Sequence, residues 1–196
     1  RSPAQRASRI DDALSMVQMN AFAKRYPAQL SGGQQQRIAL ARALVFEPKL
    51  VLMDEPLGAL DKQLREHMQL ELKALHKKLG ITFVYVTHDQ SEALTMSDRV
   101  AVFDQGIIQQ ISPVNTLYES PCNRFVAGFV GDCNQFEGVV QASSDGHCVV
   151  HLSNGTAITG LNISQAQVGA PCIVAMRPER IRIVSGQASP DTNLIR

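Results

Sequence analysis

The sequence has few aromatic residues, an almost balanced charge and no long apolar run, and each of these absences excludes a class of protein. Aromatic residues make up 5% of the 196 residues, and tryptophan is absent. The formal net charge is +1, so nothing predicts the clustered basic face of a nucleic-acid-binding protein. No apolar stretch approaches the length of a membrane-spanning helix. We therefore predict a cytosolic chain that binds no nucleic acid.

Closely spaced cysteine pairs are also missing. The four cysteines are Cys122, Cys133, Cys148 and Cys172, and no two of them form a C-x-x-C pair. A structural zinc site or a redox pair is therefore not indicated. We expect four reduced cysteines that are buried as small apolar side chains.

A further absence is the phosphate-binding loop, since no G-x-x-x-x-G-K-[ST] segment occurs in the sequence. In many nucleotide-binding proteins the backbone N–H groups of that loop cradle the phosphates and its lysine reaches the terminal ones. Any phosphate site within these 196 residues must be built differently.

One segment does have the features of such a site, and it begins at Leu30-Ser31-Gly32-Gly33-Gln34. The serine and the glutamine three residues later form a capping box, which predicts a helix start. The two glycines leave backbone N–H groups free of side chains at that helix N-terminus. An anion such as a phosphate is favoured there by both the donors and the helix dipole.

The same segment continues into a short apolar strand, Leu50 to Met53, that ends in Asp54 and Glu55. Because uncharged residues fill this strand, we expect it to be buried, with a site at its carboxyl end. A carboxylate there needs a compensating charge, and Mg²⁺ is the usual one beside a nucleotide. The second carboxylate can polarise a water molecule.

A third feature is a histidine that directly follows a second apolar strand. A long apolar stripe predicts a helix from Asp61, its N-cap, to Gly80, which ends it. The β-branched and aromatic run from 81 to 87 predicts a buried strand, and His88 follows at the same end of the sheet as Asp54 and Glu55. Asp89-x-x-Glu92 is a second capping-box pattern and predicts a short helix to residue 96.

Together these segments resemble the ATP-binding cassette (ABC) family, an α/β fold of the P-loop NTPase type. Leu30 to Gln34 matches the signature motif, Leu50 to Glu55 the Walker B strand, Gly58 to Asp61 the D-loop, and His88 the switch histidine. The resemblance implies a homodimer in which two subunits enclose two ATP molecules.

The resemblance also assigns roles to single residues. The signature residues would bind the ATP held by the partner subunit; they are Leu30, Ser31, Gly32, Gly33 and Gln34. Of these, Ser31, Gly33 and Gln34 would contact its γ-phosphate. Asp54 would hold Mg²⁺, and Glu55 would orient or deprotonate the attacking water. His88 would grip the γ-phosphate within its own subunit, and Asp61 would communicate across the dimer.

Around this segment the pattern predicts a helical start and a β-rich end. We expect an exposed stretch over 1–8, a helix over 10–22, a hairpin of strands 99–103 and 107–111, and helices starting near 113 and 123. After residue 131 the periodicity changes to short strands at 136–141, 148–152, 156–158, 172–176 and 180–184, which favours a small barrel. Met176-Arg177-Pro178-Glu179 is similar to a motif of the OB-like regulatory tail of importer ATPases, called TOBE.

These features predict two domains, with 1–131 as the C-terminal part of an ABC nucleotide-binding domain and 132–196 as a TOBE-like barrel. The resemblance implies a peripheral ATPase subunit on the cytoplasmic face of the membrane, bound to permease subunits and served by an external solute-binding protein. The solute would be a polyamine, iron(III) or sulfate. Because the phosphate loop lies before the signature in this family, the chain is expected to be the later part of a longer protein and inactive alone.

Two alternatives remain open at this point. One is a soluble ABC ATPase without a transport role, although such chains carry coiled-coil insertions or a second cassette, and neither occurs in this sequence. The other is a non-catalytic interaction or regulatory fragment, since the signature alone would bind ATP weakly.

Overall fold

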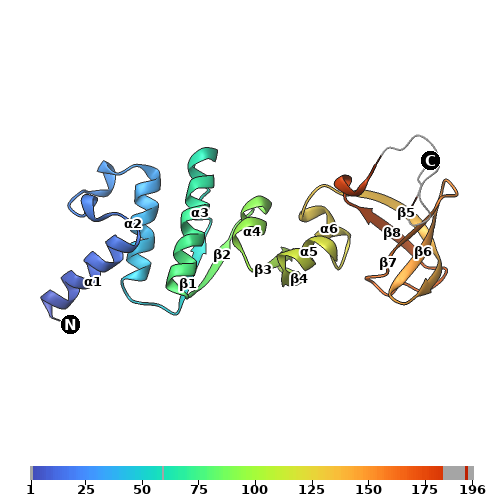
Figure 1. The fold of residues 1–196 in the computed structure, drawn as a ribbon, viewed down its shortest axis with the longest axis horizontal. Coiled ribbons are helices and arrows are strands. Elements are labelled where there is room, and N and C mark those ends of the chain that lie inside the picture. The colour runs from blue at the N-terminus through green and yellow to red at the C-terminus, as the bar shows by residue number, and fades with distance from the viewer. Residues whose placement is uncertain (1, 59, 183–192, 194–196) are drawn as a thin grey trace. The chain divides into compact units, whose positions relative to one another are not determined.

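The computed structural model describes residues 2–58, 60–182 and 193, which fall into two compact units. Unit 1 spans Arg1–Met96 and unit 2 spans Ser97–Arg196. Figure 1 labels the helices and strands of both.

Unit 1 begins with a helix that starts earlier than the sequence pattern predicts. Helix α1 spans Pro3–Met16, because Ser2 and Gln5 form a capping box and proline occupies the first turn. Residues 2–8 are exposed, as predicted for the start over 1–8, although most of them belong to this helix, and the predicted helix over 10–22 ends at Met16. Two short 3₁₀ helices follow, at Asn20–Phe22 and Pro27–Gln29.

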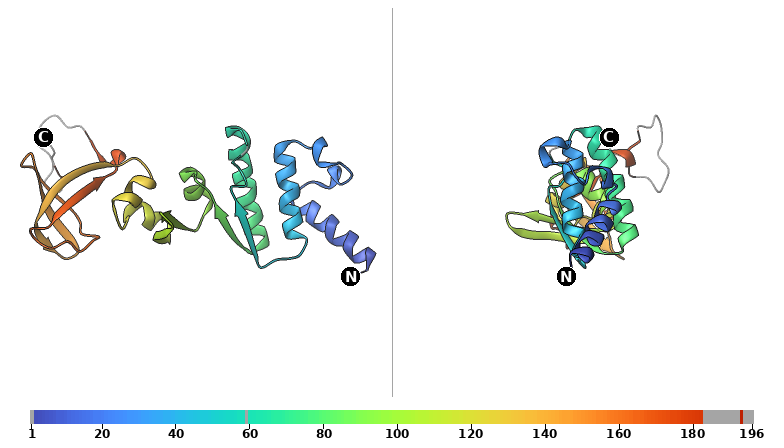
Figure 2. Two further views of the ribbon diagram at one scale, coloured as in Figure 1. Left: turned by 180° about the vertical axis from the view of Figure 1, so that it is seen from behind. Right: turned by 90° about the vertical axis from the view of Figure 1, so that its left-hand side faces the viewer.

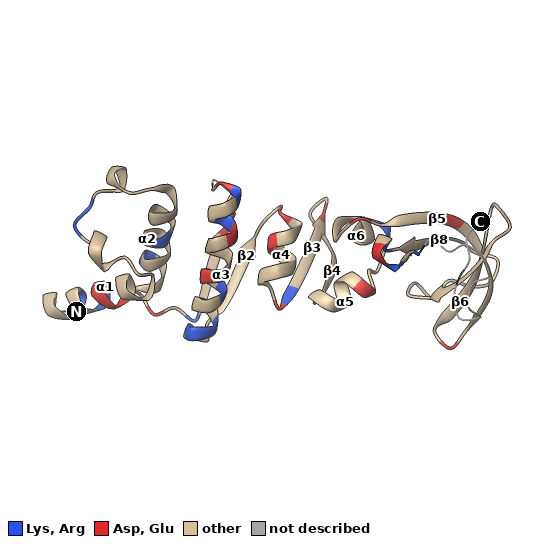
Figure 3. Ribbon diagram, turned by 45° about the horizontal axis from the view of Figure 1, so that its top comes forward, with Lys and Arg blue, Asp and Glu red and all other residues tan. Residues whose placement is uncertain are grey.

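The rest of unit 1 consists, in chain order, of α2 (Gly32–Leu44), β1 (Leu50–Asp54), α3 (Lys62–Leu79), β2 (Thr82–Val86) and α4 (Gln90–Met96). The two strands pair in parallel, with Leu50 opposite Thr82 and Asp54 opposite Val86. Figure 2 shows α3 running alongside the strands that it connects, and Figure 3 shows both basic and acidic residues along this helix. The carboxyl ends of β1 and β2 are therefore neighbours, as predicted.

The two strands are covered on one face only, so the prediction that both are buried holds for that face and is wrong for the other. Val51 is buried in a core with Ala41, Leu44 and Leu75 from α2 and α3. The residues that point the other way remain exposed within the part of the chain that the structure describes, and Leu52 keeps 72% of its surface. The same face includes Leu50, Val84 and Val86.

Unit 2 begins with the predicted hairpin, β3 (Arg99–Asp104) and β4 (Ile107–Pro113). Its turn residues Gln105 and Gly106 both have positive φ, the backbone that a tight two-residue hairpin turn requires. Two short helices follow, α5 (Val114–Glu119) and α6 (Arg124–Phe129), and Asn123, the residue before α6, is its N-cap.

An antiparallel sheet fills the rest of unit 2. Its strands are β5 (Asn134–Ser144), β6 (His147–Leu152), β7 (Ala157–Leu161) and β8 (Pro171–Met176), in the order β7-β6-β5-β8. Four of the five predicted strands are thus confirmed. The fifth strand was predicted at 180–184. Its first residue, Arg180, ends a 3₁₀ helix, Pro178–Arg180, and residues 183 and 184 lie outside the described residues. In the described sheet β7 and β8 are edge strands, so a closed barrel stays a prediction.

Arg177 ties the end of this sheet to the helices that precede it. Its guanidinium donates to the carbonyl oxygens of Ala127 (2.9 Å), Gly131 (3.0 Å), Asp132 (3.2 Å) and Tyr118 (3.2 Å). The guanidinium carbon also lies 4.3 Å from the centre of the Tyr118 ring. The arginine singled out in the sequence therefore satisfies backbone acceptors at the end of α6 and in the loop after it.

Candidate functional site: the carboxyl ends of two parallel strands

The signature segment folds as the sequence predicts. Ser31 Oγ accepts a hydrogen bond from the Gln34 N–H (3.4 Å), and Gln34 Oε1 accepts one from the Ser31 N–H (3.0 Å). The N–H groups of the first turn of α2 have no carbonyl partner within the helix. Gly33 is buried against the side chain of Leu64, which would lie 3.3 Å from a Cβ at this position, whereas Gly32 is exposed. One glycine thus permits close packing of α2 on α3, and the other leaves the helix N-terminus open.

Asp54, Glu55 and His88 gather at the carboxyl ends of β1 and β2. Asp54 is the last residue of β1 and is exposed. Glu55 donates its N–H to Val86 O (2.9 Å), which continues the pairing of the two strands by one residue. Its Oε1 lies 3.0 Å from His88 Nδ1. The structure therefore brings together two residues that are 33 positions apart in the sequence, because parallel pairing aligns the strand ends.

The Glu55 carboxylate favours the protonated form of His88. The hydrogen bond to Glu55 raises the pKa of the imidazole above its usual value, and the negative charge of Glu55 adds to the effect. Both side chains are open to solvent, with exposed fractions of 77% for His88 and 51% for Glu55. The pair can therefore exchange protons with water and with a ligand.

The backbone of Glu55 has a conformation that side chains seldom adopt. Its φ is +43°, in the left-handed region, where a residue other than glycine costs free energy and is enriched at functional sites. The backbone thereby turns sharply after β1, and the carboxylate meets the loop that follows β2.

The loop after Glu55 leads into α3 and is fixed at several points. Asp61 Oδ1 accepts a hydrogen bond from the Leu64 N–H (3.0 Å), which confirms its predicted role as N-cap. The Gln36 side chain on α2 donates to Pro56 O, and Leu57 is fully buried. Of the predicted D-loop, Ala59 lies outside the described residues.

The donor set suits Mg²⁺ only as part of a larger assembly. Within residues 2–58, 60–182 and 193, no group of three or more His, Cys, Asp or Glu side chains is arranged to hold a metal ion. Asp54 offers one exposed carboxylate, and Mg²⁺ commonly binds through one or two carboxylates together with phosphate oxygens and water. Asp54 therefore fits the role of a single protein ligand beside a nucleotide.

The sequence pattern missed the residue that anchors the histidine loop, Glu92. Asp89 Oδ1 caps α4 as predicted, accepting from the Glu92 N–H (3.3 Å). The Glu92 side chain does not reach back to complete the capping box, so that half of the prediction is wrong. Its carboxylate is buried and accepts from Tyr85 OH and Thr87 Oγ1, both at 2.8 Å. The signal in the sequence that could have predicted this burial is the pair of hydroxyl side chains at the end of β2 and just after it, Tyr85 and Thr87.

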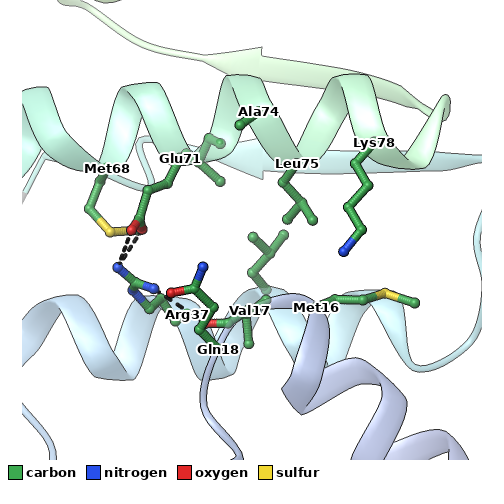
Figure 4. Close-up of a pocket in the computed structure, with 11 residues that line it drawn as sticks. Met16, Val17, Gln18, Arg37, Met68, Glu71, Ala74, Leu75 and Lys78 are labelled. Atoms are coloured by element: carbon green, nitrogen blue, oxygen red, sulfur yellow. Dashed lines mark hydrogen bonds and ion pairs between the residues drawn. The ribbon is translucent and has the colours of Figure 1, made fainter.

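A cavity of about 200 Å³ lies apart from this site, between the end of α1, α2 and α3. Figure 4 shows Arg37 and Glu71 facing each other across it, paired as an ion pair, and Arg37 also donates to Val17 O. It contains none of the residues that the motifs single out, so we assign it a packing role.

The cysteine prediction is half right. All four cysteines are free, but Cys122 is exposed and the other three are only partly buried. Burial raises the pKa of the Cys172 thiol, with a smaller contribution from Cys148, so this thiol is less reactive than an exposed one.

Comparison with known proteins agrees with this arrangement. The family model for the ABC transporter matches residues 3–58. The matched residues therefore belong to an ABC transporter ATP-binding domain.

Its relatives are importer subunits. The chain is 51% identical to the spermidine/putrescine import ATP-binding protein PotA of Rubrobacter xylanophilus over 177 residues, 89% of this chain and 47% of that protein. For PotA of Salmonella typhi the identity is 51% over 180 residues, 92% and 48% of the two chains. For PotA of Roseobacter denitrificans it is 48% over 188 residues, 96% and 52%. The chain thus spans about half the length of these relatives.

Among solved structures, the chain is similar to the ATP-binding cassette MJ0796, described as a dimer in a post-hydrolysis state with ADP and Pi. The identity is 37%, the match covers 58% of this chain and 49% of that one, and the TM-score is 0.48. In the part of our chain that the structure describes, no helix is long and apolar enough to cross a membrane.

Proposed function

We propose that this chain supplies the signature, Walker B and histidine-loop part of an ATP-hydrolysing importer subunit. The observation that carries the proposal is the contact between Glu55 Oε1 and His88 Nδ1 at 3.0 Å, beside Asp54, at the carboxyl ends of two parallel strands. A carboxylate and an imidazole at that place suit the activation of a water molecule for attack on a phosphoryl group.

In the proposed reaction ATP is hydrolysed by phosphoryl transfer to water, where catalysis is mostly positioning and charge stabilisation. Glu55 orients and polarises the attacking water, and His88 donates a hydrogen bond to the γ-phosphate. Asp54 holds Mg²⁺, which neutralises phosphate charge when bound. Ser31, Gly33 and Gln34 at the N-terminus of α2 cover the γ-phosphate of ATP held by a second copy of the subunit. Asp61 communicates across that dimer.

The proposed solute is a polyamine, since the relatives that match about nine tenths of the chain are named as spermidine/putrescine import proteins. In this proposal the subunit lies on the cytoplasmic face of the membrane and drives permease subunits that receive the solute from an external binding protein. Residues 1–131 belong to the nucleotide-binding domain, and residues 132–196 form the TOBE-like domain.

A chimera tests the proposal. The matching segment of the Salmonella typhi relative is replaced by this chain, and ATP hydrolysis and spermidine uptake are measured. We expect both activities in the chimera. Glu55→Gln should lower hydrolysis by about 10²–10⁴-fold, the usual range for a general acid or base, and Ser31→Arg should abolish it by placing bulk and charge where the phosphate approaches.

Glu66→Gln is the matched control, since it neutralises an exposed carboxylate in the second turn of α3 that the sequence motifs do not include. It should leave both activities unchanged. Near-normal turnover in Glu55→Gln would refute the assignment of Glu55. Hydrolysis without spermidine uptake would favour a non-transport ATPase or another solute, and a folded chimera without hydrolysis would favour a non-catalytic interaction module.

A further inference from the structure

A buried carboxylate on α4 organises the loop that carries His88. Glu92 is 2% exposed, and its Oε2 accepts hydrogen bonds from Tyr85 OH and Thr87 Oγ1. Thr87 Oγ1 in turn accepts from the Asp89 N–H (3.0 Å). Hydrogen bonds to and from the Thr87 hydroxyl thus fix both sequence neighbours of His88, Thr87 and Asp89, while the imidazole contacts Glu55.

The positive partner of this carboxylate is Arg65, in the first turns of α3. Its Nε lies 3.7 Å from Glu92 Oε1 and its Nη1 3.2 Å from Asp89 Oδ2. Its Nη2 donates to Leu60 O (3.1 Å), in the loop that leads from Glu55 to the N-cap of α3. One guanidinium therefore contacts the loop after β1 and the loop after β2 at once.

This arginine does not merely form a surface ion pair. Its Nε is buried and, among the described residues, has no hydrogen-bond partner, although it faces a carboxylate that is 3% exposed. Burial and the hydrogen bond to Glu92 also raise the pKa of Tyr85, so its hydroxyl stays protonated and can donate to the carboxylate. Removing Arg65 would leave the buried Glu92 carboxylate without this cationic partner.

We propose that Arg65 and Glu92 are positioning residues that hold the loops after β1 and β2 together, so that His88 meets Glu55. Arg65 spans the gap between the loops, and Glu92 anchors the histidine loop to α4. The catalytic consequence rests on the proposed function, whereas the positioning is a property of this chain without nucleotide.

The test is a side-chain NMR spectrum of the 196-residue chain, which records the ring nitrogens of its five histidines, with His88→Gln used for assignment. In Glu55→Gln the His88 signals shift because its partner has changed. We expect Arg65→Gln and Glu92→Gln to shift them in the same direction. Arg65→Lys should restore the parent signals only in part, because an ammonium cannot match the planar fork of a guanidinium that contacts Glu92, Asp89 and Leu60 at once.

Arg37→Gln is the matched control, as Arg37 is also a half-buried arginine paired with a glutamate on another helix. It should leave the His88 signals at their parent positions even where it lowers the melting temperature. Parent-like His88 signals in folded Arg65→Gln overturn the proposal. If Arg65→Gln does not fold, Glu92→Gln, which keeps an oxygen for Tyr85 and Thr87, decides by the same criterion. No nucleotide is used, so the result is independent of whether the chain serves an ATPase.

Discussion

At the scale of single residues, proximity rather than burial gives this site its chemistry. Glu55 and His88 are both open to solvent, and their interaction depends on the 3.0 Å contact. An exposed pair is screened by water and salt and adds little to stability. Its value is that it fixes the imidazole orientation and favours the protonated form.

We expect the His88 imidazole to titrate above the usual value of about 6.5, because Glu55 raises its pKa. Since the folded-state pKa is the higher one, the pair is fully formed below the usual pKa and is lost as pH rises through the raised value. An NMR titration of the chain measures this. Glu55→Gln should lower the pKa toward the usual value, whereas Glu66→Gln should not; equal effects of the two substitutions would contradict the contact.

At the scale of elements, the sheet of unit 2 depends on one position without a side chain. A Cβ on Gly138 in β5 would lie 2.5 Å from Val150 Cγ1 and 2.6 Å from His151 O in the neighbouring strand β6. Backbone atoms cannot move away without breaking the ladder between the two strands. Close approach of β5 and β6 at this point therefore requires glycine.

Gly138→Ala should accordingly lower the free energy of unfolding of unit 2 by about 1–3 kcal/mol, the usual cost of overpacking. Gly160→Ala in β7 is the control, because nothing lies within 4 Å of the added carbon and the backbone there is ordinary. It should be neutral or stabilising by up to about 1 kcal/mol. Denaturant unfolding compares the two, and equal losses would show that the close approach is not what matters.

Arg177 links separate elements of unit 2 through four hydrogen bonds. Arg177→Lys removes the fork that serves four carbonyl oxygens and leaves some of them unsatisfied, at a cost of about 1–3 kcal/mol in unfolding free energy. Arg180→Lys should change it by less than about 0.5 kcal/mol, since the pair with Glu119 is exposed. Thermal unfolding of both variants measures the difference, and a parent-like melting curve for Arg177→Lys would disprove the structural role of the motif.

At the scale of the whole molecule, the 196 residues contain the strand-end pair and the capped helix but no phosphate-cradling loop. Most of the binding free energy for the phosphates would come from such a loop and its lysine. The elements present in this chain would therefore contribute more to orienting and activating the attacking water than to binding ATP.

Isothermal titration of this chain with ATP and Mg²⁺ should accordingly give no measurable heat. The outcome follows from the proposed division of labour, in which the signature acts on ATP held by another subunit. Saturable binding would show that these residues form a nucleotide site without the loop. Ser31→Arg would then locate it, since this variant should lose the heat if the N-terminus of α2 is the binding site.

The sequence by itself determined the elements and the order of the motifs. Local rules were sufficient for this: the capping box at Ser31, the N-cap at Asp61, the αL glycine at Gly80 and the turn of the hairpin are each decided by neighbours within four residues. The apolar runs likewise predicted both parallel strands.

Only the tertiary structure decided which distant residues meet. The contact of Glu55 with His88, the exposed face of β1 and β2 that includes Leu52, and the burial of Glu92 beside Arg65 all depend on how elements pack across tens of residues. Local pattern assigned Glu92 to a helix cap because a capping box and a buried anchor share the same spacing. Which one forms depends on the free energy of burying that carboxylate among Tyr85, Thr87 and a guanidinium, and that environment exists only after folding.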